Sequence, residues 1–227
     1  MITVDLAETK LRELNRRLHA LPPGTNERDW RLINPRGTHS IAVGLDAPID
    51  VTIDGHVGYY CAGMNKQANI TINGQCGWGV AENIMSGVVR VRGNASQSAA
   101  ASGRGGLVVI EGDASARCGI SMKGVDIVVG GSVGHMSAFM AQRGNLVVCG
   151  DAGADLGDSI YEANLYVAGK VASLGADCEA KPMDAKHREA LKALLDRAGI
   201  KADVTRFKRY GSARKLYHFH VDHAEAY

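Results

Sequence analysis

A unit of 19 residues repeats seven times between Val51 and Cys178 without an insertion or a deletion. Each copy opens with two apolar residues separated by one position, and a glycine stands at its fifth place. This pattern predicts a short strand followed by a turn. The copies open at Val51, Ile70, Val89, Val108, Ile127, Leu146 and Leu165. Because a unit of this length cannot bury an apolar face alone, the copies must stack into a solenoid.

This stacking predicts an all-β fold: a single-stranded parallel, right-handed β-helix of about seven 19-residue coils with three short faces, flanked by N- and C-terminal α-helices. The first and third residues of each strand are expected to point inward, because side chains alternate along a strand. The fifth-place glycines are expected to turn the corner with a positive φ, which glycine adopts at low cost. These structural turn glycines are Gly55, Gly74, Gly93, Gly112, Gly131, Gly150 and Gly169.

Two further columns of residues are expected to point inward after the glycine corner. They are Val57, Cys76, Ala95, Ala114, Val133, Ala152 and Val171, and then Cys61, Val80, Ala99, Cys118, Ser137, Leu156 and Gly175. Most of these residues are small, which predicts a narrow core. At the last place of the unit Asn or Asp recurs, and such side chains are expected to bond to their own backbone in a turn.

The chain divides into three parts. Residues 1–50 are expected to form an N-terminal helix and an extended lead-in, residues 51–178 the β-helix, and residues 179–227 a C-terminal helix and a basic docking tail. Both helices are expected to cap the open ends of the solenoid, where strand edges would otherwise lack partners.

Capping signals and apolar spacing predict the two helices. The first follows a capping box at Asp5–Glu8 and presents leucines at helical spacing. The lead-in is expected to contain a strand near Ser40 to Val43. The second helix begins at Pro182, places Leu191, Leu194, Leu195 and Ala198 on one face, and ends at Gly199.

An outward stripe changes character along the solenoid. At the second place of each unit, the first three residues are polar and the last four apolar: Thr52, Thr71, Arg90, then Val109, Val128, Val147 and Tyr166. Large apolar patches are normally covered. The cover is either the chain's own terminal helix or a partner subunit, in which case Val109, Val128, Val147 and Tyr166 are interface residues.

Two other groups are candidate interface residues. Tyr59 and Trp78 share a column in adjacent coils and are expected to stack outside the rod, as cross-coil packing or as an interface hot spot. Between Arg197 and Tyr217, seven basic residues accompany one acidic residue. Because the whole chain carries a net charge of only +2, this tail is interpreted as a protein-docking arm that uses Arg209, Tyr210, Arg214 and Tyr217, and no nucleic-acid partner is expected.

The residue pattern favours a scaffold over an enzyme. No paired carboxylates, no nucleophile with a base and no cofactor-binding loop stand out, so no catalytic or cofactor-binding residue is predicted. The five cysteines lack CxxC spacing and are expected to be buried thiols. His218, His220 and His223 are weak candidates for a zinc site. Without a signal peptide or a long apolar run, the chain is expected to be cytoplasmic, with no membrane partner.

The repeat also carries a family resemblance. The succession Ile70-x-Ile-x-Gly-x-x-Gly, followed by Gly87-Val-Val-Arg-Val-Arg-Gly93, resembles the GXGXG domain of the glutamate synthase superfamily, which also occurs in the β-helix subunit of formylmethanofuran dehydrogenase. The segments Asn34–Ser40 and Arg209–Phe219 are similar to those of the free-standing β-helix subunit of N-methylglutamate synthase and related glutamate synthase-like complexes. The resemblance covers nearly the whole chain.

This resemblance implies a division of labour among three subunits. The partners would be a class II glutamine amidotransferase-like subunit and an FMN-dependent glutamate synthase-like subunit, which would carry the FMN and an iron–sulfur cluster. The complex would convert glutamate and methylamine to N-methylglutamate and ammonia. The chain itself would hold no cofactor and would keep the other two subunits in register.

Two alternatives remain open. One is the β-helix subunit of a formylmethanofuran dehydrogenase-type complex. The other is a stand-alone zinc β-helix enzyme that uses the three tail histidines.

Overall fold

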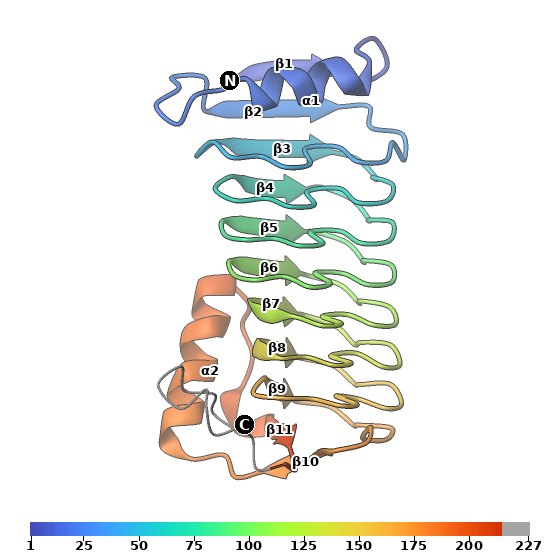
Figure 1. Cartoon of the computed structure of the whole chain (residues 1–227), viewed down its shortest axis with the longest axis vertical. Helices are drawn as coiled ribbons and strands as arrows, with labels where there is room; N and C mark the ends of the chain where they lie inside the picture. The colour runs from blue at the N-terminus through green and yellow to red at the C-terminus, as the bar shows by residue number, and fades with distance from the viewer. Residues whose placement is uncertain (215–227) are drawn as a thin grey trace, which may run out of the picture.

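The computed structural model describes residues 1–214, and it shows a β-solenoid in which one strand of each coil stacks on the next (Figure 1). In the described part of the chain the strands form a single sheet in the order β1-β2-β3-β4-β5-β6-β7-β8-β9-β11-β10. The strands are β1 (Ile2–Asp5), β2 (Asp29–Ile33), β3 (Asp50–Asp54), β4 (Asn69–Ile72), β5 (Val88–Val91), β6 (Leu107–Ile110), β7 (Lys123–Val129), β8 (Arg143–Val148), β9 (Asn164–Val167), β10 (Cys178–Lys181) and β11 (Lys208–Ser212). The helices are α1 (Leu11–His19), α2 (Ala185–Ala198) and the short 3-10 helix η1 (Val204–Arg206).

The pairing of β3 to β9 follows the 19-residue period. Val51 pairs with Ile70, Ile70 with Val89, and so on in parallel register to Leu165 in β9. The first and third residues of each 19-residue unit are buried, with 0 or 1% of their surface exposed. The predicted all-β parallel solenoid of about seven coils is therefore confirmed.

The solenoid begins earlier than the repeat. Strands β1 and β2 add two parallel rungs, and Trp30 of β2 pairs with Val51 of β3. The prediction of a strand near Ser40 to Val43 is wrong, because Ser40 and Ala42 have left-handed backbone angles and lie in a turn. The alternation in Asp29-Trp-Arg-Leu-Ile33 was the signal for β2, with Trp30 and Leu32 buried.

Helix α1 covers the N-terminal end of the core, as predicted. Its Leu14 and Leu18 are each 1% exposed and belong to the main core cluster. The prediction of a capping box at Asp5–Glu8 is wrong. Asp5 ends β1, where its Oδ1 accepts a hydrogen bond from the Ala7 amide, and the helix begins only at Leu11 without a side-chain cap.

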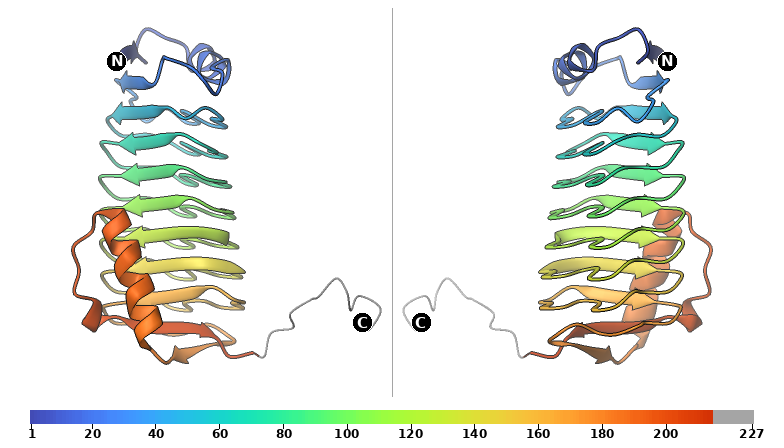
Figure 2. Two further views of the ribbon diagram at one scale, coloured as in Figure 1. Left: turned by 90° about the vertical axis from the view of Figure 1, so that its left-hand side faces the viewer. Right: turned by 90° about the vertical axis from the view of Figure 1, so that its right-hand side faces the viewer.

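Helix α2 ends at Gly199 as predicted, but it begins at Ala185 and not at Pro182, and it lies in a different place. The Asp184 side chain accepts a hydrogen bond from the His187 amide at the N-terminus, and Gly199 ends the helix with a φ of 63°. The helix lies along the side of the solenoid and does not cap its end (Figures 1 and 2). Strands β10 and β11, which are antiparallel, close that end.

Only one of the three expected faces is a continuous sheet. The second inward column forms single parallel bridges, such as Val57 to Cys76 and Cys76 to Ala95. The next stretch is not a strand, because non-glycine residues there repeatedly take the left-handed conformation. In the coil that follows β3 these are Tyr60, Ala62 and Met64, with φ angles of 57°, 58° and 54°.

The last coil breaks the period by one residue. Its second inward column keeps the 19-residue interval, since Ala152 bridges to Val171. Its third inward position is Leu174, which bridges to Leu156 at an interval of 18 residues. The expectation that Gly175 fills this column is therefore wrong.

Side chains form a second set of bonds between coils. At the sixth place of the unit, a side-chain acceptor in one coil takes a hydrogen bond from the backbone N–H at the same place in the next coil. The acceptors are His56, Asn94, Asp113, Ser132 and Asp151. We call this row of bonds the polar ladder. At the last place, Asn69 and Asn145 bond to the carboxylates of Asp50 and Asp126 in the preceding coil, and not to their own backbone as expected.

The fifth-place glycines are required mainly for space. Of the seven, only Gly55 has a positive φ, of 134°. At Gly93, an added Cβ would lie 2.9 Å from the carbonyl oxygen of Gly74 in the preceding coil. The expectation of positive φ at every corner is thus wrong, because what excludes a side chain is the close approach of successive coils.

We expect Gly93→Ala to lower the free energy of unfolding by about 1–3 kcal/mol, since the new methyl group would force two backbones apart. Gly24→Ala is the matched control, because nothing lies within 4 Å of a Cβ there. Urea denaturation of both variants checks this. Equal stability of Gly93→Ala and the original protein would contradict the close-approach explanation.

Candidate functional site

The apolar stripe is covered by the chain itself. Val109, Val128, Val147 and Tyr166 are at most 1% exposed, and they pack with Leu191, Leu194, Leu195 and Ala198 of α2 and with Phe207. In Figure 2, α2 runs across the strands at the C-terminal half of the sheet. The intramolecular cover is confirmed, and the stripe residues are not a free interface.

We expect Leu191→Ala to lower the free energy of unfolding by about 2–5 kcal/mol, because Leu191 is fully buried between α2 and the sheet. Lys192→Ala, one position along on the exposed side of α2, is expected to change it by less than about 0.5 kcal/mol. Thermal melting of both variants distinguishes a packed helix from one that only rests on the surface.

The first part of the basic tail belongs to the fold. Arg209 and Tyr210 lie in β11, which pairs with both β9 and β10. The Arg209 guanidinium donates to Asn164 Oδ1 and to the Pro182 carbonyl, and Tyr210 is 8% exposed. The expectation that these two residues form a free docking arm is therefore wrong. Arg214 pairs with Asp177, and Tyr217, His218, His220 and His223 lie outside the described residues.

Tyr59 and Trp78 stack across adjacent coils, as predicted. Their ring centroids are 5.7 Å apart with an interplanar angle of 29°. His39 stacks on the other face of Tyr59 at 4.4 Å, and its Nδ1 accepts a hydrogen bond from the Tyr59 amide. His39 could not be assigned to this stack from the repeat, because its coil precedes the first 19-residue copy.

Three more large apolar side chains lie exposed on the same two coils as Tyr59 and Trp78. The five residues, each 40 to 52% exposed, are Tyr59, Tyr60, Met64, Trp78 and Met85, and we call the stacked rings of Tyr59 and Trp78 the aromatic patch. Gly77 and Gly79 make room for the rings, since an added Cβ would lie 2.8 Å from the Tyr59 ring or 3.3 Å from the Tyr60 ring. Half-exposed Tyr, Trp and Met are the residue types enriched at protein interfaces.

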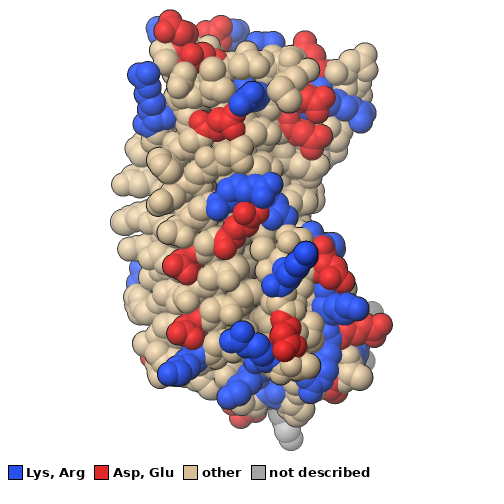
Figure 3. Space-filling model, turned by 180° about the vertical axis from the view of Figure 1, so that it is seen from behind, with Lys and Arg blue, Asp and Glu red and all other residues tan. Residues whose placement is uncertain are grey.

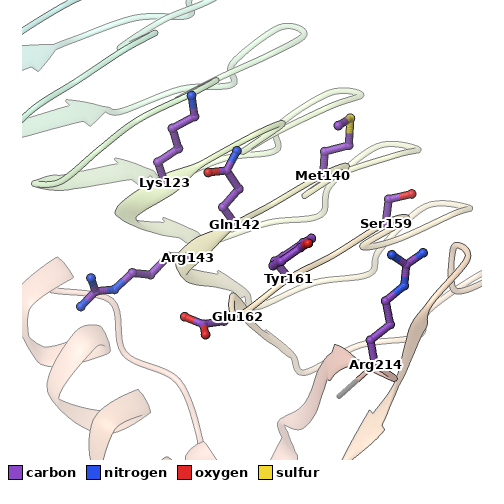
Figure 4. Close-up of a pocket in the computed structure, with 8 residues that line it drawn as sticks. All are labelled: Lys123, Met140, Gln142, Arg143, Ser159, Tyr161, Glu162 and Arg214. Atoms are coloured by element: carbon purple, nitrogen blue, oxygen red, sulfur yellow. The ribbon is translucent and has the colours of Figure 1, made fainter. Parts of the chain in front are cut away.

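A groove of about 670 Å³ lies farther along the solenoid (Figure 4). Its wall is made of columns of residues that stand 19 positions apart, so successive coils contribute equivalent side chains. Lys123, Gln142 and Tyr161 form one such column, and Arg214, which follows β11, lies beside Tyr161. The other lining residues are Met140, Ser159, Arg143 and Glu162.

The outer strand face has a different electrostatic character from the groove. Basic and acidic side chains alternate on the surface seen in Figure 3. Arg90 and Arg92 both donate to Glu111 Oε1, at 2.9 and 3.1 Å. Arg90 also donates to the Ala198 carbonyl at the end of α2, which ties the helix to the sheet. Partly exposed ion pairs of this kind contribute little to stability individually.

A full-length relative is known. The chain is 58% identical over 229 residues to Protein GlxC of Rhizobium meliloti (strain 1021), with 100% of both chains covered. It belongs to the GlxC family. No protein-family model and no solved structure matches it.

The GlxC-family chain has its thiols in or near the core. Cys61, Cys76 and Cys118 are buried, as predicted, and Cys149 and Cys178 are partly exposed. Burial raises the pKa of Cys76 and of Cys118 to about 12. Within residues 1–214 no three His, Cys, Asp or Glu side chains are grouped so that they could hold a metal ion. Neither described α-helix has the length and apolar character needed to cross a bilayer.

We expect Cys61, Cys76 and Cys118 of the GlxC-family chain to resist DTNB at pH 8. For Cys76 and Cys118, a pKa of about 12, against an ordinary value of 9.0, leaves about 1,000-fold less thiolate, and only the thiolate reacts. Burial likewise raises the pKa of Cys61 well above its ordinary value. Cys149 and Cys178 should react first, and all five thiols should react at once in guanidinium chloride. Rapid labelling of Cys118 in the native protein, detected by mass spectrometry, would contradict this assignment.

Proposed function

We propose that this chain is a non-catalytic scaffold subunit of a heteromeric glutamate synthase-like complex, most specifically N-methylglutamate synthase. In this complex it would hold an amidotransferase-like subunit and an FMN-dependent synthase-like subunit in fixed relative positions. The FMN and the iron–sulfur cluster belong to the synthase subunit in this proposal. The GXGXG resemblance supports the choice of complex.

The observation that carries the scaffold proposal is the aromatic patch on a rigid rod. Tyr59 and Trp78 are 46 and 52% exposed although they are held in a stack with His39. Ordering a side chain on binding costs conformational entropy. The stacked rings have already lost much of this freedom before a partner binds, so the cost of binding is smaller. The patch therefore has the composition and the preorganisation of an interface hot spot.

The rod itself suits the scaffold role. Its coils are joined by a continuous hydrogen-bonded sheet from β1 to β10. The patch lies on the coils that follow β3 and β4, whereas the groove involves the coils that follow β6 to β8. Two catalytic subunits bound at these separate surfaces would be kept at a constant spacing, so that a nitrogen-bearing intermediate need not diffuse far.

The test is to purify the tagged chain from its native host under mild conditions and to identify its partners by mass spectrometry. We expect an amidotransferase-like and a synthase-like subunit, a flavin spectrum, and methylamine-dependent formation of N-methylglutamate that requires all three chains. Recovery of the chain alone, or activity of the chain alone, would contradict the proposal.

The double variant Tyr59→Ala/Trp78→Ala tests the patch within the same experiment. We expect it to lose one partner while its melting temperature changes little, because both side chains are half exposed. Lys192→Ala, on the exposed side of α2, is the control and should retain both partners. Full recovery of both partners with the double variant would remove the patch from the interface.

A further inference from the structure

The groove in the coils after β6 to β8 has a net positive lining. Its basic residues are Lys123, Arg143 and Arg214, and its acidic residue is Glu162. Figure 4 shows Arg214 beside Tyr161, with its guanidinium directed toward Ser159. The groove is thus walled by two parts of the chain that are far apart in sequence.

Two of these cations have no partner among the described residues. Elsewhere on the coils, Lys66 pairs with Asp46, and Arg90 and Arg92 pair with Glu111. In residues 1–214 no carboxylate lies within ion-pair distance of Lys123 or Arg143, whereas Arg214 pairs with Asp177. An electropositive groove with unpaired cations is complementary to carboxylates.

The groove also offers apolar surface beside its charges. Met140 and Tyr161 are each 50% exposed and line the same space. A small anion would use only the cations and leave these two side chains in water. An occupant that carries both carboxylates and apolar side chains would use the whole lining.

The dimensions of the groove agree with a peptide. Lys123, Gln142 and Tyr161 stand on three successive coils, and rungs of a sheet are about 4.8 Å apart. The column therefore spans about 10 Å between its outer members, which is the length of about three residues of extended chain.

We infer that this groove docks an acidic segment of a partner subunit, with carboxylates bound by Lys123 and Arg143 and an apolar side chain packed on Met140 and Tyr161. The inference rests on the proposed scaffold function and adds to it the chemistry of one docking site. It also assigns the groove and the aromatic patch to different contacts.

A peptide-binding experiment tests the groove directly. The probe is a fluorescein-labelled peptide of sequence ELEDLEEL, and fluorescence anisotropy at low salt measures its dissociation constant. We expect Lys123→Glu/Arg143→Glu to weaken binding by at least about tenfold, because attraction becomes repulsion. Lys192→Glu makes half of this charge change at an exposed position on α2 and should have little effect.

Three results of this experiment would overturn the inference. One is equal binding of the peptide QLQNLQQL, in which every carboxylate is replaced by an amide. Another is unchanged binding to Lys123→Glu/Arg143→Glu with an unaltered circular dichroism spectrum. The third is competition by free glutamate at the same concentration as the peptide, which would indicate a small-molecule carboxylate site.

Purification from the native host separates this inference from the proposed function. If the original chain recovers both partners and Lys123→Glu/Arg143→Glu loses one, the docking inference is supported. If the double variant also recovers both, the groove is not a docking site although the scaffold function stands. If the original chain recovers no partner, the scaffold function fails, and the anisotropy measurement alone decides whether the groove binds acidic peptides.

Discussion

Contact between equivalent backbone positions of successive coils is the constraint on which the rest of this structure depends. From β3 to β9 each strand pairs with the next at the same place in the unit. The coils are therefore only about 4.8 Å apart, and nothing larger than a hydrogen atom fits where two corners meet. The small residues, the corner glycines and the polar ladder all follow from this spacing. A larger residue at such a corner would force the two coils apart there.

The same constraint decides which surfaces are free. A sheet with one buried face needs a cover for any apolar residue on its other face, and α2 provides that cover only where the outward stripe is apolar. Thr52 and Thr71 lie beyond the helix and remain partly exposed. Large exposed apolar side chains then gather on the turns, where Tyr59 and Trp78 can stack from coil to coil without disturbing the core. The proposed partner surfaces thus lie on the part of each coil that the sheet does not constrain.

Much of the fold could be predicted from the sequence because the seven copies of the repeat can be aligned with one another, which shows which positions have the same structural role. The strand positions of the repeat, the end of α2 at Gly199 and the stack of Tyr59 on Trp78 were all predicted. The strands that prediction missed or misplaced lie outside the repeat. Trp30 and Leu32 belong to a coil without the 19-residue spacing, and Tyr210 belongs to a strand inserted between β9 and β10. The groove could not be predicted because Arg214 reaches it only through that non-local pairing.

The reversal of direction at the end of the sheet has a consequence for assembly. Stacked coils present at each end a surface much like the one they use internally, and such a rod could grow by adding further molecules. Here β11 runs antiparallel between β9 and β10, and the preceding coil is one residue short. The inserted strand leaves β10 at the edge of the sheet, where it runs in the same direction as β9 but is only four residues long and carries Glu179 and Lys181. Short, charged edge strands disfavour pairing with a second molecule. The C-terminal end of the sheet is thereby blunted, which disfavours end-to-end growth of the rod.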